Sequence, residues 1–116
     1  DGYGDGEQSR DFIYVKDLVR VHRYFWQNRH RSGVFNCGTG SANPFNAVAR
    51  ALIARLGFGH IEYVPFPSSL AGKYQSFTEA DLTQLRSSGC DVAFTPLPEA
   101  VAEYCDCLEK TGGYFR

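Results

Sequence analysis

Length, composition and charge are those of a small globular domain. The chain has 116 residues, of which 43% are hydrophobic and 22% charged, enough for one domain with a modest core. The formal net charge of −1 argues against a protein whose main task is electrostatic binding to nucleic acid or anionic lipid. No apolar run approaches the roughly 18 residues of a membrane span. We therefore expect neither a nucleic acid nor a membrane as a partner.

The first residue and the cysteines indicate what kind of chain this is and where it works. The sequence begins at Asp1 and contains no methionine, so we expect it to be a piece of a longer protein. The four cysteines, Cys37, Cys90, Cys105 and Cys107, form no C-x-x-C pair, and no histidine lies at the spacing of a zinc site. We expect four free thiols in a reducing cytoplasm, and no bound metal.

The first half of the chain alternates between turn, strand and helix signals. Residues 1–9, DGYGDGEQS, predict a turn or a hairpin tip. Residues 11–15, DFIYV, predict a short strand. Residues 16–28 predict a helix, largely buried because its apolar side chains form a broad face. Residues 34–37, VFNC, predict a second strand, which the glycine turn at 38–40 ends.

The next helix has clear signals at both ends. Asn43 is a suitable cap and Pro44 suits the first turn. Apolar residues then follow the i, i+3, i+4, i+7 spacing as far as Leu56, and Gly57 is a natural stop.

The remaining elements are shorter. Residues 61–64, IEYV, predict a third strand, and residues 78–81 fit a helix start. Thr95 and Pro96 open the last helix. The sum is an α/β fold with short strands and about four helices. Such short strands would complete the sheet of another domain better than stand alone.

Three features suggest a binding site, each with a plainer alternative. The Gly38-Thr39-Gly40 turn precedes a helix and could contact an anion, although a tight structural turn is favoured. Arg10 could bind a diphosphate as a two-pronged donor, or could form a surface pair with Asp11. Tyr74 could present its hydroxyl to a polar ligand, although taken alone a packed tyrosine is favoured.

These features fall together in one known pattern. Four segments of the chain resemble segments of the extended short-chain dehydrogenases/reductases. They are RDFIYVKDLV at 10–19, VFNCGTG at 34–40, ADLTQLRSSGCDVAF at 80–94 and LPEAVAEY at 97–104. Within this superfamily, IEYVPFPSSLAGKYQSFTEADLTQLRSSG at 61–89 resembles the ADP-heptose 6-epimerases. The resemblance covers residues 1–108.

The resemblance implies a fold and a function. The chain would be the C-terminal substrate-binding portion of a Rossmann-type enzyme, a single lobe over residues 1–116, with the N-terminal NADP-binding domain outside it. The parent enzyme would be a cytoplasmic homo-oligomer. It would bind NADP and convert ADP-D-glycero- to ADP-L-glycero-D-manno-heptose for lipopolysaccharide core synthesis.

The resemblance also assigns residues. Arg10 matches the arginine expected at the substrate diphosphate and Tyr74 the tyrosine expected at the sugar, whereas Asp1, Gly2 and Tyr3 fall near a substrate loop. The family's G-x-x-G-x-x-G loop and Tyr-x-x-x-Lys pair are not in this sequence. We therefore expect no catalytic or cofactor-binding residues here, and a fragment that alone is inactive and binds no NADP.

Two alternatives remain open. The chain could be the substrate lobe of another nucleotide-sugar epimerase or dehydratase. It could also be a stand-alone nucleotide-binding or interaction module, because helices and short strands of this kind can in principle close a small core.

Overall fold

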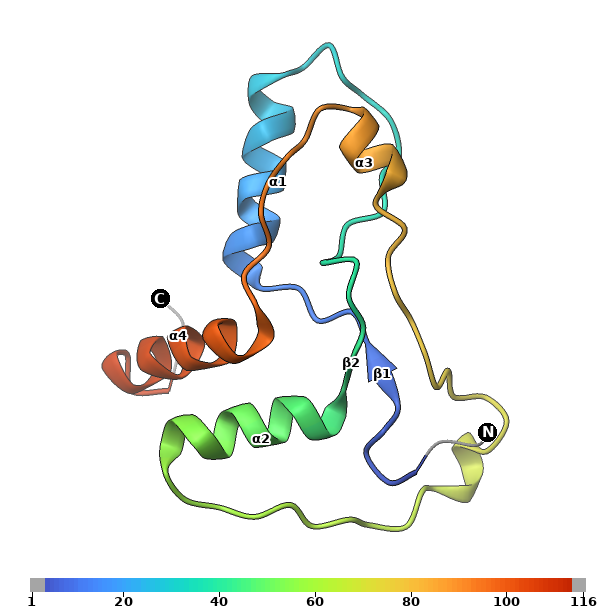
Figure 1. Ribbon diagram of the computed structural model, residues 1–116, viewed down its shortest axis with the longest axis vertical. Coiled ribbons are helices and arrows are strands. Elements are labelled where there is room, and N and C mark those ends of the chain that lie inside the picture. Colours follow the sequence, from blue (N-terminus) through green and yellow to red (C-terminus); the bar gives the residue numbers. More distant parts are fainter. Residues whose placement is uncertain (1–3, 114–116) are drawn as a thin grey trace.

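The computed structural model describes residues 4–113 (Figure 1). Within that range the elements in chain order are β1 (Ser9–Arg10), α1 (Val15–Gln27), β2 (Asn43–Pro44), α2 (Phe45–Leu56), the 3-10 turn η1 (Ser68–Leu70), α3 (Thr83–Ser87) and α4 (Leu97–Lys110). Helix α1 stands upright with α3 beside it, and α2 and α4 pack together near its lower end. The α/β class and the four helices of the sequence prediction are confirmed.

The three predicted strands are wrong. In the described part of the chain, β1 and β2 form an antiparallel two-stranded sheet with Ser9 opposite Pro44 and Arg10 opposite Asn43. Residues 11–14, 34–37 and 61–64 lie outside it. A strand is defined by hydrogen bonds to a neighbouring strand, and these segments have none within the described residues. Their β-branched and aromatic composition therefore does not suffice to make strands.

The helices follow the predicted apolar spacing closely. Helix α1 begins and ends within one residue of the predicted bounds. Helix α2 ends at Gly57, whose φ of 78° is a left-handed conformation that glycine adopts without strain. Its predicted cap is wrong, because Asn43 pairs in β2, its side chain bonds the carbonyl of Ser41, and Pro44 occupies the cap position.

Helix α3 begins at Thr83, later than residues 78–81 suggested. The Asp81 carboxylate accepts a hydrogen bond from the Thr83 N–H at 2.9 Å, so the acid lies just before the first turn. Residues 78–80 instead run beside the chain segment that contains β1.

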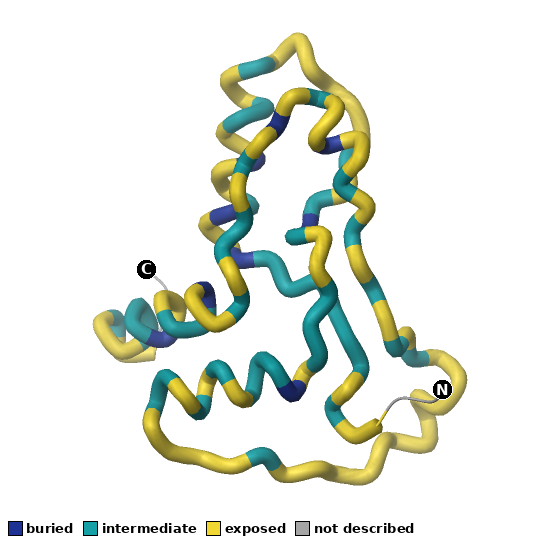
Figure 2. The backbone as a smooth tube through the Cα atoms, viewed as in Figure 1, coloured by how far each residue is buried: buried dark blue, intermediate teal, exposed yellow. Residues whose placement is uncertain are grey.

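The buried core is small and lies between α1 and the α3 region. Val21, Leu85 and Cys90 form it, and dark segments are sparse along the tube in Figure 2. The radius of gyration is 16.8 Å, against about 13 Å for a compact domain of this length. The described chain is therefore more open than an ordinary globular domain.

The prediction that α1 is largely buried is wrong. Only Asp17 and Val21 of this helix are buried, whereas Val19 is 58% and Trp26 70% exposed. The α3 region covers the side of α1 that carries Val21. No described segment covers the opposite stripe, so its apolar residues stay in solvent.

Candidate functional site

Arg10 and Tyr74, the two residues expected at the substrate, are in contact. The guanidinium carbon of Arg10 lies 4.9 Å from the centroid of the Tyr74 ring, a distance at which a cation is attracted to the aromatic face. The guanidinium also donates hydrogen bonds to the backbone carbonyls of Gln75 and Ser9. The fold thus brings these two residues together from distant parts of the sequence.

Backbone hydrogen bonds hold this pair in place. The Ser9 N–H donates to the carbonyl of Ser76 at 2.8 Å, and the Thr78 N–H donates to the carbonyl of Ser9 at 3.1 Å. Ser9 and Phe77 consequently form a parallel bridge, while β2 pairs with the other edge of the same segment. The backbone around Arg10 is therefore fixed on both sides.

A cavity of about 260 Å³ opens beside Tyr74. Its lining is Gln8, Phe66, Leu70, Ala71, Gly72, Tyr74 and Ser76. The ring of Phe66 meets Tyr74 edge to face, with centroids 5.4 Å apart. A neighbouring hollow of about 390 Å³ shares Gln8 and Phe66 with it. Aromatic faces next to a guanidinium can hold an aromatic or sugar group beside a phosphate.

No acid within the described part of the chain pairs with Arg10. Within residues 4–113 no carboxylate forms an ion pair with it, since the neighbouring acid, Asp11, points to other partners. The alternative of a surface pair between Arg10 and Asp11 is therefore wrong. Neighbouring residues of an extended segment face opposite sides, which separates the two groups.

The glycine turn at 38–40 holds a carboxylate from within the chain. Asp11 Oδ1 accepts hydrogen bonds from the N–H and hydroxyl of Thr39, at 2.7 and 2.6 Å, and Oδ2 accepts from the N–H of Gly40 at 2.9 Å. A Cβ added at Gly38 would lie 2.4 Å from Asp11 Oδ2, so only glycine permits this approach. The turn is structural, and its amides are not available to a phosphate.

Asp11 also joins a third segment, because Oδ2 accepts a hydrogen bond from the Ala80 N–H at 3.1 Å. Burial acts to raise the pKa of Asp11, but the hydrogen bonds from Thr39, Ala80 and Gly40 outweigh it. The pKa therefore lies below its ordinary value of 3.8.

Asn46 is a buried polar residue that sequence reasoning missed. Its side-chain amide donates to the carbonyl of Asp5 at 2.9 Å and to the Glu7 carboxylate at 2.5 Å, and its oxygen accepts the Tyr63 hydroxyl at 3.0 Å. It thereby fixes the glycine-rich N-terminal turn against the wall of the 390 Å³ hollow. The available signal was an asparagine among the apolar residues that begin α2.

The other sequence candidates contribute less. Asp1, Gly2 and Tyr3 lie outside the described residues. Among residues 4–113, no group of three histidine, cysteine or acidic side chains is placed to hold a metal ion. The described cysteines are free thiols. A dinucleotide such as NADP does not fit the glycine turn, because the Asp11 carboxylate fills it. No helix in the described range is both long and apolar enough to cross a membrane.

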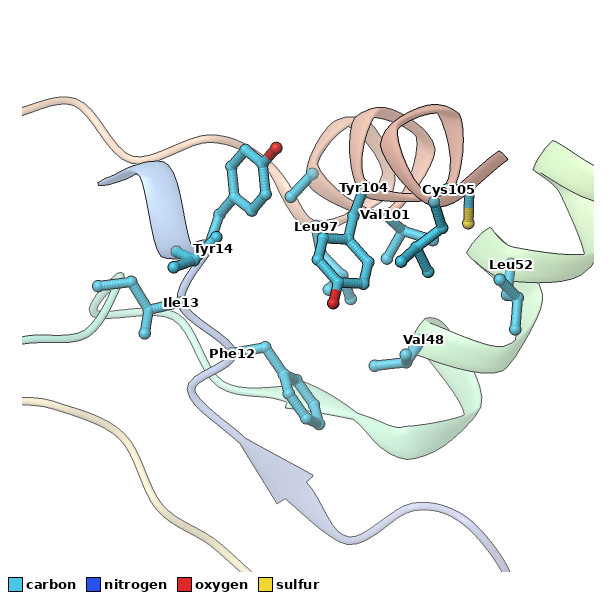
Figure 3. A pocket seen from close by; sticks show the side chains of 12 residues that line it. Phe12, Ile13, Tyr14, Val48, Leu52, Leu97, Val101, Tyr104 and Cys105 are labelled. Carbon is cyan, nitrogen blue, oxygen red and sulfur yellow. The ribbon is translucent and has the colours of Figure 1, made fainter. Parts of the chain in front are cut away.

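A larger cavity, of about 450 Å³, lies elsewhere (Figure 3). Residues 12–15, α2 and α4 line it on its several sides, and Phe12, Val48, Leu52, Leu97 and Val101 are among the lining residues. This open hollow is the α2–α4 groove. No charged side chain among residues 4–113 lines it. It offers no partner for a phosphate, so the Arg10–Tyr74 region is the better candidate site despite its smaller volume.

Two comparisons with known proteins found similarities to this chain. Residues 2–38 match the NAD-dependent epimerase/dehydratase family. The resemblance to nucleotide-sugar epimerases of this class, expected from the sequence, is confirmed. The chain is similar to the ADP-L-glycero-D-manno-heptose-6-epimerase of Alkalilimnicola ehrlichii, with 52% identity over 108 residues. The match covers 93% of this chain and 34% of that relative, so the chain spans about a third of its length.

Proposed function

We propose that this chain is the substrate-binding part of an NADP-dependent epimerase that acts on an ADP-heptose. The observation that carries the proposal is the contact between Arg10 and Tyr74 beside the 260 Å³ cavity. Both residues lie in segments that resemble these epimerases, and both belong to a chain 52% identical to a protein of that name.

The geometry suggests a role for each residue. Arg10 would bind the diphosphate, because its guanidinium carries a charge that no described carboxylate neutralises. Tyr74 would contact the sugar with its hydroxyl or ring edge. Phe66 packs against Tyr74 and would limit the motion of the ring. These groups bind and orient a substrate, and none of them supplies a base or a hydride.

The redox chemistry would be supplied by NADP bound outside this chain, in an N-terminal cofactor domain of a longer protein. We expect the parent enzyme to be a cytoplasmic homo-oligomer that supplies a precursor of the lipopolysaccharide core. We expect the fragment alone to be inactive and to bind no NADP. Saturable binding of NADP at micromolar concentration to the pure fragment would contradict the proposal that the cofactor binds outside this chain.

Replacement of Arg10 tests the proposed site. In the longer protein, Arg10→Ala should weaken ADP-sugar binding tenfold to a hundredfold, since a hydrogen bond to a charged group is worth roughly 1.5–3 kcal/mol. Arg23→Ala is the matched control, because Arg23 is an exposed arginine on α1. Calorimetric titration and steady-state kinetics measure the effect. Unchanged KM and kcat in Arg10→Ala would remove Arg10 from the site.

The choice of nucleotide separates this proposal from its relatives within the class. A titration with ADP-, UDP- and GDP-sugars should show preference for the ADP-sugar. A preference for UDP- or GDP-sugars would instead favour a different nucleotide-sugar epimerase or dehydratase.

A further inference from the structure

Asp11 links the segment that carries Arg10 to two others. One carboxylate oxygen accepts from the backbone and side chain of Thr39, and the other accepts from the N–H groups of Gly40 and Ala80. These four bonds have lengths of 2.6–3.1 Å. A carboxylate with this many donors is held rigidly, because each oxygen is satisfied twice.

The bond to Ala80 extends a regular series of contacts. Ser9 bonds to Ser76 and Thr78 through its backbone, and two residues further along each segment Asp11 bonds to Ala80 through its side chain. Residues 9–11 and 76–80 are therefore aligned in parallel. Tyr74 and Gln75, which contact the Arg10 guanidinium, immediately precede the aligned stretch. The placement of Tyr74 relative to Arg10 consequently depends on this alignment.

The bonds to Thr39 and Gly40 act from the other side. The glycine turn leads directly into β2, where Asn43 pairs with Arg10. By holding the turn, Asp11 fixes the strand that flanks Arg10 on the edge opposite Phe77. The Asp11 carboxylate thus holds both segments that flank the Arg10 backbone, β2 on one side and residues 76–80 on the other.

We propose that Asp11 is a positioning residue for the Arg10–Tyr74 site, an inference that rests on the proposed function. It does not contact the substrate. It aligns the 76–80 segment and the glycine turn so that the guanidinium and the Tyr74 ring face the ligand together. Asp11 therefore determines affinity through Arg10.

The test is a double-mutant cycle in the longer protein. Asp11→Asn replaces one carboxylate oxygen with an amide that faces N–H donors, so it should raise the KM for the ADP-sugar roughly tenfold while kcat changes less than about twofold. In an Arg10→Ala background the same change should add little, because the residue through which Asp11 acts is gone.

The matched control is Asp81→Asn. Asp81 also accepts a backbone hydrogen bond, from Thr83 at 2.9 Å, but it belongs to the start of α3 rather than to the site. It should leave KM unchanged. Thr39→Val, which removes one donor to Asp11 and keeps the side-chain shape, provides a milder variant if Asp11→Asn fails to fold. It should raise KM about threefold, again without effect in the Arg10→Ala background.

The outcomes separate the two proposals. An unchanged KM in folded Asp11→Asn, or an equal increase with and without Arg10, overturns the positioning role even when Arg10→Ala alone weakens binding. If Arg10→Ala alone has no effect, the proposed function fails. Hydrogen exchange of the Thr39, Gly40 and Ala80 amides then tests whether Asp11 holds these segments in place. Faster exchange in Asp11→Asn supports that role, and unchanged exchange overturns it.

Discussion

Two regions of the molecule differ sharply in how they are held. The junction around Asp11 is polar, and its side chain and backbone groups find partners in the glycine turn and in residues 76–80. The groove between α2 and α4 is apolar and open, and Leu52 on its wall is 41% exposed. Hydrogen bonds made within the described chain specify the first region. The second keeps apolar surface in water, so within the described residues it lacks the burial that would stabilise it.

The largest expected effect contrasts a core leucine with a groove leucine. Leu85 is 0% exposed and belongs to the small core, so Leu85→Ala should destabilise the chain by roughly 2–5 kcal/mol. Leu52→Ala, which is matched in chemistry, should cost less than about 1 kcal/mol. Urea unfolding monitored by circular dichroism measures both. Equal losses would mean that the groove is covered in solution.

A second prediction concerns the buried acid of α1. Asp17 accepts hydrogen bonds from the Thr95 N–H at 2.6 Å and hydroxyl at 3.0 Å, and it pairs with Arg20. Asp17→Ala leaves these donors without their acceptor and should lower the free energy of unfolding by about 2 kcal/mol. Glu99→Ala, at an exposed acid in the first turn of α4, is the control and should change it by less than about 0.5 kcal/mol. A loss at Asp17 no larger than that of the control would refute the anchoring of α4 to α1.

A smaller effect is expected from pH. Because the pKa of Asp11 is lowered in the folded chain, its carboxylate stabilises the fold above the ordinary value of 3.8, and this stability is lost as the pH falls through the folded pKa. The difference in Tm between the unmodified chain and Asp11→Asn should therefore shrink between about pH 6 and pH 3. A difference that stays constant over this range would show that the Asp11 charge does not matter to the fold.

The helices could be predicted because their signals are local. Apolar spacing and the terminal Gly57 of α2 act within one segment, and all four helices appear near their expected places. The strands could not be predicted, because DFIYV and VFNC need hydrogen-bond partners that their own composition does not reveal. Strand propensity therefore predicts more strands than the described residues form.

The residues of the candidate site are proposed from the family resemblance, whereas their contacts come from the fold. Family resemblance identified Arg10 and Tyr74, yet only the fold shows that the guanidinium lies over the ring. Adjacency in the sequence suggests Asp11 as a partner of Arg10. Its true partners, Thr39, Gly40 and Ala80, are distant in the chain, and no local pattern indicates them.

The most direct test is to follow an ADP-sugar titration of the longer protein by NMR. The account predicts that the Arg10 side-chain N–H and the Gln75 amide shift saturably, while the methyl groups of Leu52 and Val101 in the α2–α4 groove do not. Saturable shifts at the groove, with Arg10 and Gln75 unmoved, would place the ligand in the apolar region and contradict the proposed site.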